Sequence, residues 1–107
     1  MAGDEARWTA VAVLSDFGSD RRLVRTIADR EVLLVRLGND VVAVLNRCTH
    51  LGHALERGRV MAGQITCPLH GACFDLRTGA ALSGPAVAPL QRFEARIADD
   101  RVEVRLP

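Results

Sequence analysis

Two short stretches in the middle of this chain, CTHLG at positions 48–52 and CPLHG at positions 67–71, have the composition of metal-binding loops. Each contains one Cys, one His and a final Gly, and residues 51–66 separate the first His from the second Cys. Thiolates are strong soft ligands for iron and zinc, and neutral imidazoles bind both metals. We therefore predict a metal site with four protein ligands: Cys48, His50, Cys67 and His70.

The order of these ligands bears on which metal they bind. Structural zinc modules usually pair like with like, two Cys from one knuckle and two His from one helix, or four Cys from two knuckles. Here each pair is mixed, which suits a two-iron cluster whose irons take two thiolates and two imidazoles respectively. The glycines in both loops let backbone N–H groups approach the cluster sulfurs. A zinc site with the same four ligands is the alternative.

The motif resembles that of Rieske proteins, in which Cys-x-His is followed further along the chain by Cys-x-x-His. The resemblance extends to Phe74-Asp75 and to Arg77-Thr78-Gly79, which look like the strand and turn after the second cluster loop of Rieske ferredoxins. It implies that a Rieske-type 2Fe-2S cluster is this chain's cofactor, with Cys48, His50, Cys67 and His70 as its ligands.

Four positions depart from the pattern of Rieske subunits in respiratory cytochrome bc complexes. Those subunits have a disulfide between two extra Cys where this chain has His53 and Leu69, and hydroxyl donors where it has Ala72 and Phe74. Hydrogen bonds to cluster sulfur stabilise the reduced form and raise the potential. The resemblance therefore implies a low-potential centre, at about −150 mV, the lower end of the Rieske range.

The sequence on both sides of the motif predicts β-structure. Alternating or β-branched apolar runs indicate strands, and Gly38-Asn39-Asp40 and Asp99-Asp100 indicate hairpin turns between them. The expected strands are 8–14, 22–27, 31–37, 41–46, 59–61, 64–66, 74–76, 91–97 and 101–106. The expected fold class is all-β, a Rieske iron-sulfur fold with an antiparallel β-sheet base and a loop-rich cluster-binding subdomain. In this prediction residues 1–107 form a single Rieske domain, with the subdomain at about 47–89 inserted in a base formed by 1–46 and 90–107.

Several side chains outside the motif also have expected places. Trp8 and the three Phe are expected to fill the small core, as large apolar side chains usually do. Cys73 is expected to be a small buried hydrophobe, and His53 a solvated loop residue.

Composition excludes some classes of partner. The 14 basic residues, all Arg, nearly balance the 13 acidic ones, and they are scattered, so nucleic acid is not an expected partner. No apolar run reaches the ~18 residues that span a bilayer, and the N-terminal residues lack the charge pattern of a signal peptide. We expect a cytoplasmic protein without a membrane anchor.

The resemblance implies a one-electron carrier between an NAD(P)H-dependent flavoprotein reductase and a terminal oxygenase. An oxygenase itself needs a second iron held by two His and a carboxylate, whereas His53 is the one His that the cluster leaves over. We therefore expect an electron-transfer protein rather than an enzyme. Two alternatives are the small Rieske-like subunit of an assimilatory nitrite reductase and a zinc-stabilised structural module.

Overall fold

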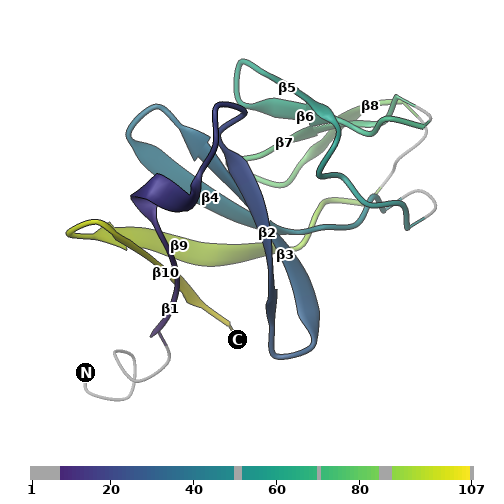
Figure 1. The fold of residues 1–107 in the computed structure, drawn as a ribbon. Coiled ribbons are helices and arrows are strands. Elements are labelled where there is room, and N and C mark those ends of the chain that lie inside the picture. The colour runs from purple at the N-terminus through teal and green to yellow at the C-terminus, as the bar shows by residue number, and fades with distance from the viewer. Residues whose placement is uncertain (1–7, 50–51, 70, 85–87, 107) are drawn as a thin grey trace.

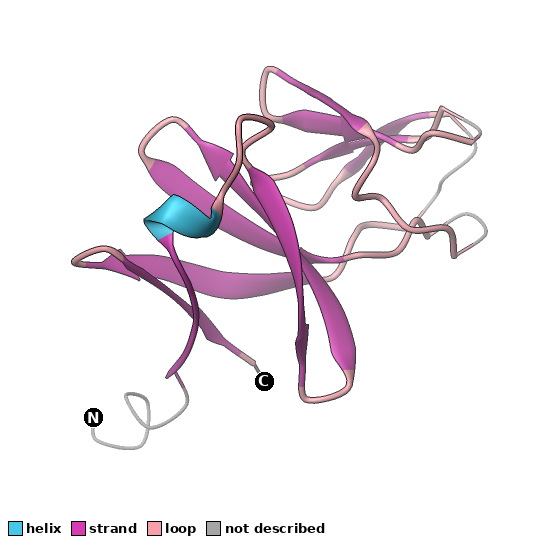
Figure 2. Ribbon diagram, in the orientation of Figure 1, coloured by secondary structure: helices cyan, strands magenta, loops and turns pink. Residues whose placement is uncertain are grey.

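In the computed structural model, which describes residues 8–49, 52–69, 71–84 and 88–106, two antiparallel sheets lie against each other (Figures 1 and 2). The larger sheet has the strand order β1-β10-β9-β4-β3-β2 and takes strands from both ends of the chain. The smaller sheet has the order β5-β6-β7-β8. The larger sheet contains β1 (Trp8–Val13), β2 (Arg22–Ile27), β3 (Arg30–Leu37), β4 (Asp40–Leu45), β9 (Arg92–Ala98) and β10 (Arg101–Arg105), and the smaller one contains β5 (Arg59–Met61), β6 (Gln64–Thr66), β7 (Cys73–Asp75) and β8 (Ala81–Ser83).

The all-β prediction is confirmed, with local differences. The first strand ends at Val13, where a 3-10 turn, η1 (Leu14–Asp16), begins. The strand predicted at 74–76 begins one residue earlier, at Cys73. Strand β8 was not predicted, because Ala81-Leu82-Ser83 lacks the β-branched and aromatic residues that mark strands in a sequence. Among the described residues, no helix has the length and apolar character needed to cross a membrane.

The middles of strands β3 and β4 are buried on both faces, which explains the continuous apolar runs Val32–Val35 and Val41–Val44. On one face, Val32 and Leu34 of β3 belong to a core enclosed by the larger sheet, together with Phe93 and Val102. On the opposite face, the alternating residues of the same strands pack against the smaller sheet. This second core contains Leu33, Val35, Val42, Val44, Leu55, Ile65, Phe74, Leu76 and Leu90, and it also contains Cys48 and Cys67.

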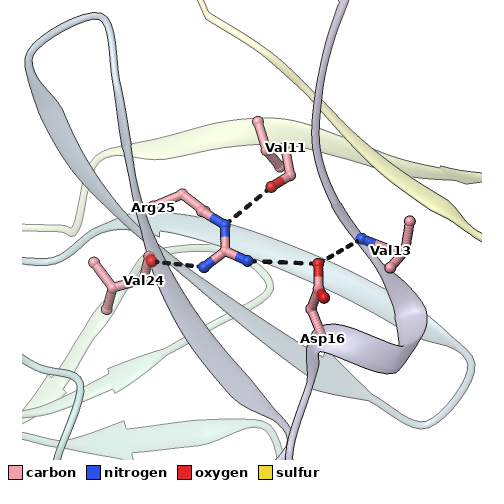
Figure 3. A network of polar contacts seen from close by, with 5 residues as sticks. All are labelled: Val11, Val13, Asp16, Val24 and Arg25. Carbon is pink, nitrogen blue, oxygen red and sulfur yellow. Dashed lines mark hydrogen bonds and ion pairs between the residues drawn. The ribbon is translucent and has the colours of Figure 1, made fainter.

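The larger sheet curls until its edge strands β1 and β2 face each other, and an arginine joins them (Figure 3). The pairing of β1 with β10 shifts at Val11, between Ala10 and Ala12, and a bulge of this kind releases a backbone group from the ladder. Arg25 of β2 donates from Nε to the Val11 carbonyl at 3.0 Å, and from Nη2 to the Asp16 carboxylate at 3.5 Å. Asp16 in turn accepts from the Val13 N–H at 3.0 Å. The Arg25 side chain thus joins β1 and β2, the two edge strands, which do not pair through backbone hydrogen bonds.

Replacing Arg25 by methionine keeps the aliphatic stem and removes these charged hydrogen bonds. We expect the free energy of unfolding to fall by about 1–2 kcal/mol, because Arg25 is half-buried and its acceptors lie across the seam, on the opposite edge strand and in the 3-10 turn that follows it. Arg77→Met is the matched control, since Arg77 pairs with Asp40 at the surface and such pairs contribute about 0–1 kcal/mol. Urea unfolding of both variants checks this, and equal losses would contradict the role given to Arg25.

The aromatic residues divide between core and surface. Phe17, Phe74 and Phe93 are buried, as predicted. The prediction for Trp8 is wrong: it is only half-buried on edge strand β1, with the guanidinium of Arg96 4.1 Å from its ring centroid. A guanidinium packs well on an indole face. The Trp8 ring on this edge strand is therefore covered by an arginine side chain and does not enter the core.

Candidate metal centre

The structure brings Cys48 and Cys67 into the same buried cluster. Cys48 follows the end of β4 and Cys67 follows the end of β6, and each is 2% exposed. Both belong to the core between the two sheets. None of the three cysteines forms a disulfide. Two reduced thiols therefore lie at the ends of strands from different sheets, at the edge of one apolar core.

The two predicted ligand loops close with the same hydrogen bonds. The Cys48 N–H donates to the His53 carbonyl at 2.7 Å, and the Cys48 carbonyl accepts from the Gly52 N–H at 2.8 Å. Likewise, the Cys67 N–H donates to the Ala72 carbonyl at 2.7 Å, and its carbonyl accepts from the Gly71 N–H at 3.1 Å. The two cysteines thus occupy equivalent positions in two equivalent loops, as a site that takes one thiolate from each loop requires.

Gly52 and Gly71 allow the two ligand loops to turn back on themselves. Their φ angles are 76° and 74°, a conformation that side chains rarely adopt, so glycine allows each loop to turn back. Their N–H groups bond to the carbonyls of Cys48 and Cys67. These two amides therefore close the loops.

Ala88 and Gly84 each contact one of the two loops. The Thr49 hydroxyl of the first loop donates to the Ala88 carbonyl at 2.8 Å. Gly84 packs against the second loop so closely that an added Cβ would lie 2.8 Å from Ala72 Cα. Ala88 is therefore tied to the first loop, and Gly84 lies directly against the second.

Asn46 fastens the base of the first loop. It is 5% exposed and is the one polar residue among the buried residues of the described part of the chain. Its Oδ1 accepts from the Leu55 N–H at 2.8 Å, and its Nδ2 donates to the Glu31 carboxylate at 3.2 Å. The Asn46 side chain thus ties its own position, two residues before Cys48, to Leu55 at the end of the loop and to Glu31 on β3.

Two of the four predicted ligands can be placed. Cys48 and Cys67 come together as described, whereas His50 and His70 lie outside the described residues. Within residues 8–49, 52–69, 71–84 and 88–106, no group of three metal-binding side chains is found. Two buried thiols on equivalent loops are the donor set that one iron of a mixed-ligand two-iron cluster needs, so the residues present fit such a cluster.

The other two residues singled out near the motif lie apart from this core. Cys73 is half-buried, not buried as expected, because alternation along β7 directs Phe74 into the core and Cys73 to the outer face. Its Sγ lies 3.4 Å from Gln64 Oε1 on β6. His53 is exposed, and its carbonyl closes the first loop.

The turn after β7 is held by a carboxylate. Asp75 Oδ1 accepts from the backbone N–H of Thr78 at 3.0 Å and of Arg77 at 2.8 Å. These hydrogen bonds, first that from Thr78, hold the pKa of Asp75 below its ordinary value. The stabilisation that they give is present at neutral pH and is lost as acidification protonates Asp75 through its lowered pKa.

Sequence reasoning missed the roles of Asn46 and Thr49. A polar residue at the end of an apolar strand, two positions before a ligand, was the available signal for Asn46. The partner of Thr49 is 39 positions away, and nothing in the sequence marks that contact.

Comparison with known families gives one match that covers most of the chain. The profile of the Rieske 2Fe-2S domain matches residues 7–94. The ferredoxin subunit of anthranilate 1,2-dioxygenase from Burkholderia cepacia is 33% identical over 102 residues, which cover 94% of this chain and 94% of that protein.

Solved structures give the same result. The ferredoxin of carbazole 1,9a-dioxygenase from Nocardioides aromaticivorans has a TM-score of 0.87 and 30% identity, over 94% of this chain and 98% of that one. A chain in the complex of reduced oxygenase and oxidised ferredoxin in carbazole 1,9a-dioxygenase has a TM-score of 0.83 and 28% identity, over 92% of this chain and 93% of that one.

Proposed function

This chain belongs to the Rieske 2Fe-2S domain family, and from that premise we propose that it is a one-electron carrier that delivers electrons to a terminal oxygenase. The observation that carries the proposal is end-to-end similarity to ferredoxin components of Rieske dioxygenase systems, combined with two buried cysteines on equivalent loops. The family match confirms the resemblance found in the motif and makes the 2Fe-2S cluster the cofactor in place of zinc. Its homologues are electron carriers rather than catalysts.

In the proposed site, the thiolates of Cys48 and Cys67 would hold one iron, and the imidazoles of His50 and His70 would hold the other. When bound, the cluster supplies reversible one-electron chemistry. The chain buries the two thiols in the apolar core and closes both loops with backbone hydrogen bonds. Residues 47–89, as the cluster-binding subdomain, and the base formed by 1–46 and 90–107 are part of the same proposal.

The electron donor and the location of the protein are also proposals. A flavoprotein ferredoxin reductase that uses NAD(P)H is the donor that suits a carrier of low potential. The cytoplasm is the compartment where both partners meet it. Docking to each partner must be weak and transient, since a carrier has to leave one protein before it reaches the next.

The first experiment is anaerobic purification followed by visible spectroscopy, EPR after dithionite reduction and a potential titration. We expect a brown protein with the rhombic EPR signal of a reduced Rieske centre and a potential of about −150 mV. The low value follows from fully buried Ala72 and Phe74, neither of which has a hydroxyl to donate to sulfur. A colourless protein with one zinc would contradict the proposed function, and a strongly positive potential would contradict the role of these two positions.

Electron flow needs a separate measurement. With NADH and the reductase of the anthranilate 1,2-dioxygenase system as surrogate donor, we expect bleaching of the visible spectrum, and with that system's oxygenase present, reoxidation. A loaded protein that neither reductase nor dithionite can reduce would contradict a carrier role.

A further inference from the structure

One surface hollow, which we term the arginine hollow, lies where the two sheets meet and is lined by three arginines. Arg77 comes from the turn after β7 of the smaller sheet, whereas Arg92 and Arg96 come from β9 of the larger one. The hollow has a volume of about 580 Å³, and Asn39 and Asp40, beside the turn between β3 and β4, also line it. Parts of the chain that belong to different sheets thus place positive charge around one space.

Arg92 is the arginine of this hollow whose charge is not balanced by a described carboxylate. It is exposed, and among the residues that the structure describes it has neither a hydrogen bond nor an ion pair, unlike Arg77 and Arg96. Its stem packs on Gly79, where an added Cβ would lie 3.2 Å from both Cγ and Cδ of Arg92. The stem is therefore held against the turn that carries Arg77, while the guanidinium keeps its donors for a ligand.

Carboxylates balance part of the charge of the other two arginines. Arg77 Nη1 pairs with Asp40 at 3.1 Å, but the two side chains are 52% and 67% exposed, so this pair contributes little and opens readily. Arg96 Nε pairs with Glu103 at 2.6 Å, and its guanidinium lies over the Trp8 ring, which fixes it in place. Among the described residues of the lining, three positive charges thus face the single negative charge of Asp40.

The positions of the arginines favour an extended anion over a single phosphate. Arg92 and Arg96 are four positions apart on β9, which places their Cα atoms about 13 Å apart, and Arg77 enters from the other sheet. A guanidinium forms two parallel hydrogen bonds with the oxygens of one phosphate group. Linked phosphate groups can therefore each bind a different arginine, which one phosphate group cannot do.

We propose that the arginine hollow binds an anion with two or more linked phosphate groups, and that Arg92 and Arg77 bind it from the two sheets. The inference goes beyond electron transfer and does not depend on it, since no residue of the two ligand loops is among the described residues of the lining. Inorganic pyrophosphate and the diphosphate group of a nucleotide share this chemistry. The bound anion joins the turn after β7 to β9 and so stabilises the folded protein.

Calorimetric titration of the purified holoprotein with pyrophosphate tests the site. At about 20 mM ionic strength, where surface charges are weakly screened, we expect one pyrophosphate per chain. Arg92→Gln and Arg77→Gln should each weaken binding at least about fivefold, the loss expected for one unit-charge contact in water. Asp40→Asn should instead strengthen it about two- to threefold, because it removes a repelling carboxylate and the competing partner of Arg77.

Matched variants at a distant hairpin separate a local site from a change in net charge. Arg30→Gln and Asp29→Asn make the same charge changes in the β2–β3 hairpin, at the opposite end of β3 from the arginine hollow (Figure 1). Each should leave the affinity within about 1.5-fold of wild type. Arg92→Lys keeps the charge without the forked donors, so its affinity should lie between those of wild type and Arg92→Gln.

Two further ligands and a stability measurement identify the anion. Orthophosphate should bind at least about tenfold more weakly than pyrophosphate, because it has one phosphate group. ADP that binds as tightly as pyrophosphate would assign the site to nucleotides, and ADP that binds much more weakly would assign it to the free inorganic anion. Pyrophosphate should also raise the urea midpoint of the wild type above that in sodium chloride of equal ionic strength, and Arg92→Gln should lose this increase.

Several outcomes would overturn the inference. A wild type that binds no pyrophosphate, or equal losses in Arg92→Gln and Arg30→Gln, would remove the site. Weaker binding by Asp40→Asn would contradict the charge argument, and orthophosphate as tight as pyrophosphate would contradict linked phosphates as the ligand. The EPR signal of the cluster does not enter these titrations, so failure of the proposed electron-carrier function and failure of the anion site are measured separately.

Discussion

Replacing Cys48 by serine is expected to abolish cluster binding. The wild type should hold about two irons per chain, and the variant less than about a tenth of that, with the visible and EPR signals lost to the same extent. The physical reason is that the proposed site has four protein ligands and none to spare, and a serine hydroxyl does not replace a soft thiolate on iron. Cys67→Ser should have the same effect, because Cys67 occupies the equivalent position in the second loop.

Cys73→Ser is the matched control for this experiment. Cys73 is the third cysteine, half-buried on the outer face of the smaller sheet with its Sγ beside Gln64. We expect full iron content and an unchanged EPR spectrum. If Cys73→Ser lost the cluster while Cys48→Ser kept it, the proposed ligand set would be wrong.

Replacing Asn46 by alanine is expected to cost about 2–3 kcal/mol in free energy of unfolding and to lower the iron content. The variant leaves the Leu55 N–H, buried at the end of the first loop, without its acceptor, and an unsatisfied buried donor costs about 1–3 kcal/mol. It also removes the bond to Glu31 that ties the loop to β3. Such a loss is a large fraction of the roughly 5–15 kcal/mol that stabilises a typical domain.

Urea unfolding and iron analysis of the same preparations check this prediction. Asn39→Ala is the control, since Asn39 lies exposed in the turn between β3 and β4 and its replacement should cost less than about 0.5 kcal/mol. Asn46→Asp is informative as well. It keeps an acceptor for Leu55 but places a buried carboxylate beside that of Glu31, so it should be less stable at neutral pH than at acidic pH. A fully stable, fully loaded Asn46→Ala variant would show that the loop does not depend on Asn46.

Local features of the sequence were enough for several elements of the fold. The β9–β10 hairpin turns at 99–100, as predicted, and the β3–β4 hairpin turns at 38–39, within the predicted Gly38-Asn39-Asp40, because glycine and the short polar residues Asn and Asp favour these turns. Strands β5 and β6 have the predicted bounds. The ligand motif predicted the family, since its two Cys-His pairs are unusual in composition and spacing.

Other features depend on partners far away in the sequence. Cys73 and Phe74 are adjacent apolar residues, and only the pairing of β7 with β6 and β8 decides which of them faces the core. Trp8 has the composition of a core residue, yet it lies on an edge strand, where arginines of β9 and β10 cover it. The sequence names these residues, but whether each one lies in the core or at the surface depends on strands that are distant in the sequence.

The sequence by itself determined the chemistry of the site, the all-β class and the main hairpins, because ligand identity, strand alternation and turn residues act over a few positions. The tertiary structure alone decided which charged and polar side chains close the larger sheet and hold the first ligand loop. Arg25 reaches Val11 across a seam, Asn46 holds Leu55, and Arg47 lies over Gly52. These contacts exist only after the larger sheet has curled and the loops have closed on the second core, since long-range packing, not local pattern, sets which side chains meet.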